Sequence, residues 1–251
     1  MEDLSIFVTA HMTNEATYYA LQLCITNIRN HYENNRIFII NDNSKFPVYT
    51  DNFKNKELIT VIDSDFKGAG ESLFLYYYHK MENPSKKAIY IHDSMFLISP
   101  ITKEILDNLT TVKFLLSFDK KFKIKEQEDY ISKLNEGSLI NENQNWVGCY
   151  GGACIMTHEY LTKLQNNYNI TSIVPFITCR SQREMYERIL GSVVSYDLNK
   201  NPDYNMKEEI AIYGDLYEYF EIYPTGRYHH FNYLHMNKEE LPPLLKLNFG
   251  R

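Results

Sequence analysis

The stretch Lys87 to Pro100, KAIYIHDSMFLISP, decides the expected fold. Its apolar run Ala88 to Ile91 is typical of a buried strand, because core strands are continuous β-branched and aromatic runs. Asp93 follows where that strand should end, between His92 and Ser94. A bare buried carboxylate is prohibitively costly, so Asp93 must be paired, solvated in a cleft or bound to a cation. The stretch predicts either a functional site at a strand end or a turn in which Asp93 accepts hydrogen bonds.

Earlier segments repeat this pattern of an apolar strand followed by polar residues. The expected strands are Leu4 to Ala10, Arg36 to Ile40 and Glu57 to Ile62. Helical spacing of apolar residues predicts helices from Asn14 to about Asn30 and from Ser72 to Met81. Strands that alternate with helices indicate an α/β fold with a mainly parallel, right-handed sheet covered by helices on both faces.

Acidic residues follow several of these strands. Ligands of such sheets bind at the carboxyl ends of the strands. The acids found there are Asp42, Asp63, Asp65 and Asp93. We therefore expect these side chains to border one crevice.

Length and composition favour one compact enzyme domain. The chain has 251 residues, a net charge of −6 and no linker, repeat or low-complexity run, so we expect a single domain over residues 1–251. The longest basic cluster, Lys120 to Lys125, is too short to favour nucleic acid as a partner.

The four cysteines lack the spacing of a zinc site or disulfide framework and are expected to be reduced and buried. No stretch reaches the roughly 18 apolar residues that span a bilayer.

The order of the motifs FVTA, IINDNS, KGAGES and AIYIHDS resembles the nucleotide-sugar-binding half of a GT-A glycosyltransferase. The resemblance implies a GT-A-like, Rossmann-like sheet with this half in residues 1–100. Residues 101–251 would supply the acceptor-binding half and a C-terminal elaboration. The bias toward Asn, Lys, Ile and Tyr suggests an AT-rich genome, bacterial or viral, and we expect a cytoplasmic protein, in the host cytoplasm if viral.

The resemblance also implies a donor site. The residues expected to contact the nucleotide sugar are Thr9, His11, Asp42, Lys67, Asp93 and Arg227. HDS, His92 to Ser94, stands in place of the family's metal-binding DxD motif but has only one carboxylate. Mn²⁺ or Mg²⁺ is expected on Asp93 with His230, because the phosphates and water can fill the rest of an octahedron. The single carboxylate also leaves a metal-independent variant open.

A catalytic acid is expected near the start of a helix over Ser181 to Val194. Glu184 best resembles the family's general base, with Glu187 and Asp215 as further candidates. The alternative is structural, because Ser181 and Glu184 also spell a capping box. The glycines in Trp146 to Met156, WVGCYGGACIM, predict either a loop beside the acceptor or a tight corner.

These residues predict transfer of a hexosyl or deoxyhexosyl group from a nucleoside-diphosphate sugar to a hydroxyl of a glycan or glycoconjugate. The stereochemical course stays open. The sequence leaves two alternative functions open. A nucleotidyltransferase would normally carry a glycine-rich basic loop where this chain has Ala10 to Thr13. A non-catalytic module with the GT-A fold would bind nucleotide or sugar without turnover.

Overall fold

The computed structural model describes residues 3–119, 125–143, 145–200, 209–223, 227–229 and 241–248, with the side chains of 227–229 and 248 excepted. Among these residues, no helix is both long enough and apolar enough to cross a membrane.

The chain alternates strands and helices through its first part and becomes more helical later. The strands are β1 Leu4–Ala10, β2 Arg36–Asn41, β3 Ile59–Asp63, β4 Lys87–His92, β5 Met95–Leu97, β6 Val112–Phe114, β7 Ser117–Phe118, β8 Gly148–Cys149, β9 Cys154–Thr157, β10 Arg227–His229 and β11 Leu244–Asn248. The α-helices are α1 Glu15–His31, α2 Leu73–Lys80, α3 Lys103–Asn108, α4 Lys125–Ile131, α5 Gly137–Glu142, α6 His158–Tyr168, α7 Arg180–Leu198 and α9 Leu216–Ile222. Short 3-10 turns lie at Lys56–Leu58, Gly70–Ser72, Tyr150–Gly152 and Ile170–Phe176.

A six-stranded sheet in the order β3-β2-β1-β4-β9-β6 forms the centre of the molecule. Strands β1 to β4 run parallel, and β9 pairs antiparallel with both β4 and β6. The predicted α/β fold with a mainly parallel sheet is therefore confirmed. Because β1 to β4 share one direction, their carboxyl ends meet at one edge of the sheet.

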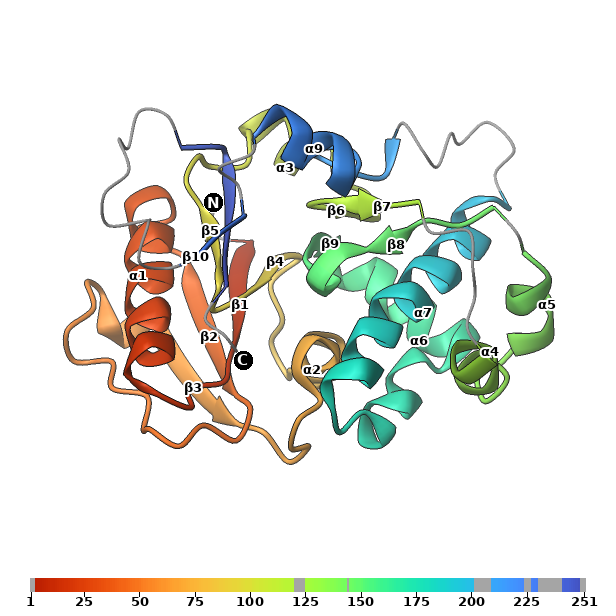
Figure 1. Ribbon diagram of the computed structural model, residues 1–251, viewed down its shortest axis with the longest axis horizontal. Coiled ribbons are helices and arrows are strands. Elements are labelled where there is room, and N and C mark those ends of the chain that lie inside the picture. Colours follow the sequence, from red (N-terminus) through yellow and green to blue (C-terminus); the bar gives the residue numbers. More distant parts are fainter. Residues whose placement is uncertain are drawn as a thin grey trace.

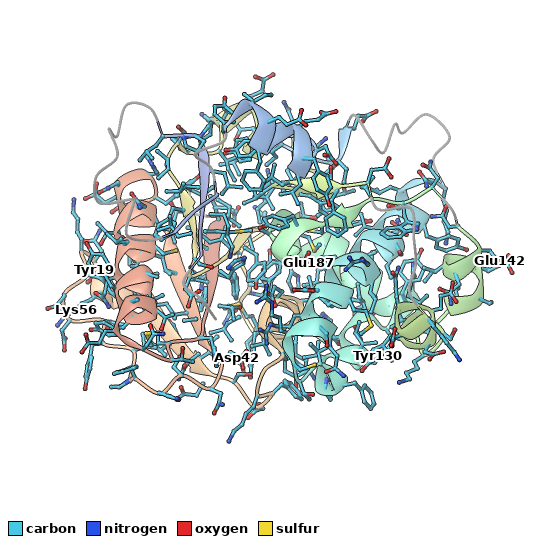
Figure 2. The ribbon with its side chains drawn as sticks, in the orientation of Figure 1. Tyr19, Asp42, Lys56, Tyr130, Glu142 and Glu187 are labelled. Carbon is cyan, nitrogen blue, oxygen red and sulfur yellow. The ribbon has the colours of Figure 1, made fainter. Side chains whose placement is uncertain are left out.

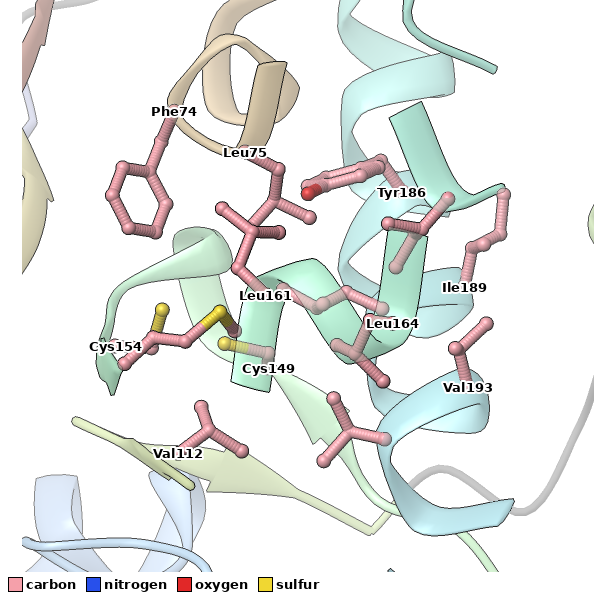
Figure 3. Packing of buried hydrophobic residues seen from close by; sticks show 14 of the residues in the cluster. Phe74, Leu75, Val112, Cys149, Cys154, Leu161, Leu164, Tyr186, Ile189 and Val193 are labelled. Atoms are coloured by element: carbon pink, nitrogen blue, oxygen red, sulfur yellow. The ribbon is translucent and has the colours of Figure 1, made fainter. Parts of the chain in front are cut away.

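The sheet separates two hydrophobic cores, and alternate residues of each strand serve opposite faces. In β1, Phe7 belongs to the core shared with α2, α6 and α7, whereas Ile6 and Val8 belong to the core shared with α1. Figure 1 shows α1 on one side of the sheet and the other three helices on the opposite side. Figure 3 shows how Phe74 and Leu75 of α2 approach Leu161 of α6 in the first of these cores.

The local sequence explains several element boundaries. Helix α1 begins after Asn14, whose side chain accepts the Thr17 amide while the Thr17 hydroxyl accepts the Asn14 amide. Strand β3 begins at Ile59, two residues later than the expected start at Glu57, because Glu57 lies in the 3-10 turn Lys56–Leu58.

Two smaller sheets extend the molecule. One has the order β10-β11-β5, in which β11 pairs antiparallel with β5. This pairing places the C-terminal strand beside the residues that follow β4. The other joins β7 to β8 and leads into the glycine turn before β9.

Candidate functional site

Hydrogen bonds join the carboxyl ends of the central strands into one polar edge. The Asp93 amide donates to the Thr9 carbonyl at 3.0 Å, and the Asp42 amide donates to the Ala10 carbonyl at 2.8 Å. The His11 amide donates to Asp93 Oδ2 at 2.9 Å, and His11 Nδ1 lies 2.5 Å from the Asp42 carbonyl oxygen. The turn after β1 is thereby fixed to both neighbouring strands, and half-buried His11 lies at this edge.

Asp42 uses its carboxylate to hold the loop before α2. Its two oxygens accept the Gly68 amide at 2.6 Å and the Gly70 amide at 2.9 Å, and Asp42 is buried. Gly70 has a φ of +50°, which disfavours residues with a Cβ, and a Cβ there would lie 2.1 Å from Cδ of Arg183. Asp42 thus shapes a loop that packs against the start of α7. The predicted contact of Asp42 with the nucleotide base or ribose stays a prediction.

The HDS motif forms a polar cluster at the end of β4 together with a residue from the C-terminal strand. Lys246 of β11 lies opposite Met95 of β5. Its Nζ is 2.6 Å from Ser94 Oγ, 3.1 Å from His92 Nδ1 and 3.3 Å from His92 Nε2. Asp93 itself is fully buried. An ammonium group therefore lies at the strand end where the sequence predicts a divalent cation.

The glycine turn Tyr150–Gly152 approaches the same strand end. Gly151 has a φ of +62°, and a Cβ there would lie 2.8 Å from His92 Nε2. On its other side, the backbone of Gly151 lies near enough to the carboxyl group of Glu187 on α7 to lower its pKa, against the larger effect of burial. Gly151 thus lies between the end of β4 and the carboxyl group of Glu187. Any larger side chain at position 151 would displace His92.

Charged side chains on one face of α7 point toward the end of β4. Arg183 and Glu187 are four residues apart and so lie on the same face of the helix. Arg183 Nε is 3.1 Å from Glu71 Oε2, close enough for an ion pair although not aligned for a hydrogen bond, and Arg183 also donates to the Gly68 carbonyl at 3.1 Å. Figure 2 shows Glu187 near the middle of the molecule, beside α7, and Asp42 closer to its lower edge.

Burial raises the pKa of both carboxyl groups, Glu71 and Glu187. Burial raises the pKa of Glu187 well above its usual range, and the negative charge of Glu71 raises it further. Burial also raises the pKa of Glu71, against the opposing charges of Arg183 and, more weakly, Lys246. A raised pKa makes the deprotonated carboxylate a stronger base, which suits Glu187 to general-base chemistry.

The structure places Glu184 elsewhere. The side chain of Glu184 is 55% exposed, and its Oε1 accepts from Arg180 Nε at 3.0 Å. The capping box predicted with Ser181 does not form, because α7 begins at Arg180 and Cys179 occupies the cap position. Glu184 therefore lies on the outer face of α7, and its catalytic role stays a prediction without a structural argument.

The remaining predicted site residues have structural roles, are exposed, or lie outside the residues that the structure describes. Asp215 caps α9 by accepting the Tyr217 amide, and Thr9 is buried and bonded to Tyr90. Lys67 is exposed. The side chain of Arg227 and the whole of His230 lie outside the described residues.

All four cysteines are free thiols. Cys24, Cys149 and Cys154 are buried free thiols, as expected, whereas the expectation that Cys179 is buried is wrong because it lies exposed at the start of α7. Trp146 is buried in the structure. The glycines of the Trp146 to Met156 stretch form a tight corner, which also borders the candidate site.

The described residues do not fit the predicted metal site. No group of three or more His, Cys, Asp and Glu side chains among them is placed to hold a metal ion. Asp93 is fully buried with Oδ2 bonded to the His11 amide, and Lys246 brings a positive charge to the same strand end. His230, the other predicted ligand, lies outside the described residues.

Sequence reasoning missed Glu71, Arg183 and Lys246. Glu71 and Arg183 could have been found from KGAGES and from the spacing of Arg183, Glu187 and Gly191, since a small residue at helical spacing indicates close packing of that face. Lys246 carries no comparable signal, because its strand pairs with residues about 150 positions earlier in the chain.

No family model matches the sequence, and no curated protein shows significant similarity to it. Among solved structures, the galactosyltransferase LgtC, in complex with donor and acceptor sugar analogues, matches with 9% identity and a TM-score of 0.43, covering 75% of this chain and 70% of its own. Core-mannan synthase A of Aspergillus fumigatus, in its Mn/GDP form, matches with 11% identity and a TM-score of 0.43, covering 79% of this chain and 70% of its own. At these scores they carry no argument about donor, acceptor or metal.

Proposed function

We propose that this protein transfers a hexosyl or deoxyhexosyl group from a nucleoside-diphosphate sugar to a hydroxyl of a glycan or glycoconjugate. The observation that carries the proposal is the position of Gly151, whose backbone acts on the pKa of Glu187 and where a Cβ would lie 2.8 Å from His92 Nε2. It brings a carboxyl group of raised pKa beside the end of β4, at the edge where ligands of parallel sheets bind. The substrate class comes from the resemblance of the strand-end motifs to GT-A glycosyltransferases.

Cleavage of the donor bond and deprotonation of the acceptor take place on opposite sides of Gly151. On the sheet side, the bond between the anomeric carbon and the β-phosphate oxygen breaks, and its electron pair passes to that oxygen. On the helix side, Glu187 takes the proton of the acceptor hydroxyl, whose oxygen forms the new bond to the anomeric carbon. Such a single displacement inverts the anomeric configuration. General-base assistance of this kind typically contributes about 10² to 10⁴-fold to the rate.

The donor would lie along the polar edge formed by the ends of β1, β2 and β4. His11 and Lys67 are retained as donor contacts in this proposal, because His11 lies at that edge and Lys67 is exposed in the adjoining loop. Asp42 contributes by holding Gly68 and Gly70 in place. Metal assistance forms no part of the proposed mechanism.

The experiment measures release of nucleoside diphosphate from UDP-, GDP-, CDP-, ADP- and dTDP-sugars with a panel of simple sugar acceptors. Glu187→Gln keeps the shape of the side chain but cannot take a proton. We expect it to lower kcat by about 10² to 10⁴-fold while leaving nucleotide affinity nearly unchanged. Glu184→Gln is the matched control, since it makes the same change one turn earlier on the exposed face of α7, and should retain parental activity.

Three results would contradict the proposal. Full activity of Glu187→Gln would remove the assigned base, and loss of activity in Glu184→Gln alone would transfer that role to the exposed residue. Nucleotide binding with no sugar transfer from any donor would favour a non-catalytic module. For an active pair, the anomeric configuration of the product by NMR tests the inversion.

A further inference from the structure

The C-terminal strand delivers a positive charge to the end of β4. Strand β11 pairs antiparallel with β5, and the Leu247 amide donates to the Ser94 carbonyl at 2.9 Å, so the pairing extends to the HDS motif itself. Lys246 thereby places its ammonium 2.6 Å from Ser94 Oγ and 3.1 Å from His92 Nδ1. The two polar side chains that flank Asp93 both contact this one cation.

Lys246 already supplies positive charge beside the carboxyl groups of Glu71 and Asp93. Glu71 is close enough for Lys246 to lower its pKa against the effect of burial. Asp93 and Lys246 act with opposite sign on the buried thiol of Cys24, which places both charges within reach of the same group. A divalent ion added beside Lys246 would meet like charge at short range. Asp93, fully buried, already accepts the His11 amide.

We propose that Lys246 takes the place of the divalent metal and stabilises the diphosphate leaving group directly. This inference rests on the proposed glycosyl transfer. When the bond from the anomeric carbon breaks, the departing diphosphate gains one negative charge, and an ammonium with three N–H donors can neutralise and bond it. Ser94 and His92 hold the ammonium, and Asp93 anchors the turn after β1.

The binding experiment uses the full chain with UDP, GDP, CDP, ADP and dTDP and the corresponding monophosphates. Affinities are measured by calorimetry in EDTA and in Mn²⁺. For the nucleotide that binds, we expect the same diphosphate affinity in both solutions. Lys246→Met should weaken diphosphate binding at least tenfold and change monophosphate binding less than twofold. Lys246→Arg should recover part of the diphosphate affinity, and Lys103→Met, on the exposed side of α3, should match the parent.

The outcomes separate this inference from the proposed function. Diphosphate binding by the parent that requires Mn²⁺ would overturn the inference and leave glycosyl transfer standing, and this arm needs no variant to fold. Unchanged affinity in a folded Lys246→Met variant would also overturn it. No binding of any nucleotide in either solution would instead count against the proposed function itself. Melting curves of each variant establish that it is folded.

Discussion

Asp42 shows how much one carboxylate can organise at the end of a parallel sheet. Both of its oxygens accept backbone amides of the loop before α2, and the residue is buried. In Asp42→Asn one amide would face an NH₂ group and lose its acceptor. Since hydrogen bonds to charged groups contribute about 1.5 to 3 kcal/mol, we expect a loss of that size in the free energy of unfolding by urea.

The control is Asp63→Asn, at the end of β3. The Asp63 carboxylate is exposed and accepts from Asn41 Nδ2 at 2.7 Å, so its replacement should cost no more than about 0.5 kcal/mol. Equal losses in the two variants would mean that the loop at Gly68 and Gly70 does not depend on Asp42.

The raised pKa of Glu187 has a direct kinetic consequence. A general base acts when deprotonated, so kcat/KM should rise with pH through the raised pKa of Glu187, above the ordinary value of about 4.3. Burial is the larger cause and the charge of Glu71 the second. Glu71→Gln removes that charge and leaves Arg183 without its acidic partner. Loss of the Glu71 charge lowers the pKa of Glu187, so the inflection of the pH profile should move to lower pH.

The same titration affects stability. A carboxyl group whose pKa is higher in the folded state stabilises the fold at low pH, and this contribution is lost as pH rises through the folded pKa. Glu187→Gln should therefore melt at a higher temperature than the parent, with a difference that grows above about pH 4.3. An unshifted kinetic inflection in Glu71→Gln, or equal melting at all pH values in Glu187→Gln, would contradict the assignment.

At the scale of elements, the close approach of α7 to β8 decides where the charged face of the helix lies. Gly191 is on the same face as Arg183 and Glu187, and a Cβ there would lie 2.0 Å from the Val147 carbonyl oxygen. This contact is between two backbones, so no side chain can yield to relieve it. Gly191→Ala should destabilise the protein by about 1 to 3 kcal/mol or more and shift Glu187 away from Gly151, lowering activity.

Urea denaturation and the transfer assay measure the two effects of Gly191→Ala. Glu184→Ala, on the exposed face of the same helix, is the control and should change stability by about 0.5 kcal/mol or less. If Gly191→Ala melted like the parent, the separation of α7 and β8 would have to be larger than the structure shows.

The main strands and helices up to β4 could be predicted because each carries a local signal. The expected strand Leu4 to Ala10 agrees with β1 at both ends, and the N-cap at Asn14 follows from its side-chain chemistry. The sequence ranks Glu184 before Glu187 as the base, although amphipathic spacing identifies the buried face of a helix but not which flank borders a crevice. That choice depends on Gly151 and on the approach of α7 to β8.

At the scale of the whole molecule, residues from distant parts of the chain converge on one edge of the sheet. Glu71 comes from the turn before α2, His92 from β4, Glu187 from α7 and Lys246 from β11. Figure 1 shows α7 on one side of the central sheet and the C-terminal strand beside β5. No local pattern encodes this convergence. It arises because the sheet fixes the strand ends while α7 and β11 pack against them from different directions.

This convergence predicts where a nucleotide will protect the backbone from hydrogen exchange. A ligand at 100 times its Kd stabilises the folded state by about 2.7 kcal/mol, and amides that open locally should be protected where the ligand binds. With saturating nucleoside diphosphate, we expect slower exchange at 68–72, at 92–94, at 150–152 and in β11. The edge strand β3 and helix α5 serve as internal controls and should exchange at unchanged rates. Protection of β3 with no change in β11 would place the nucleotide on the other side of the sheet edge, away from Lys246.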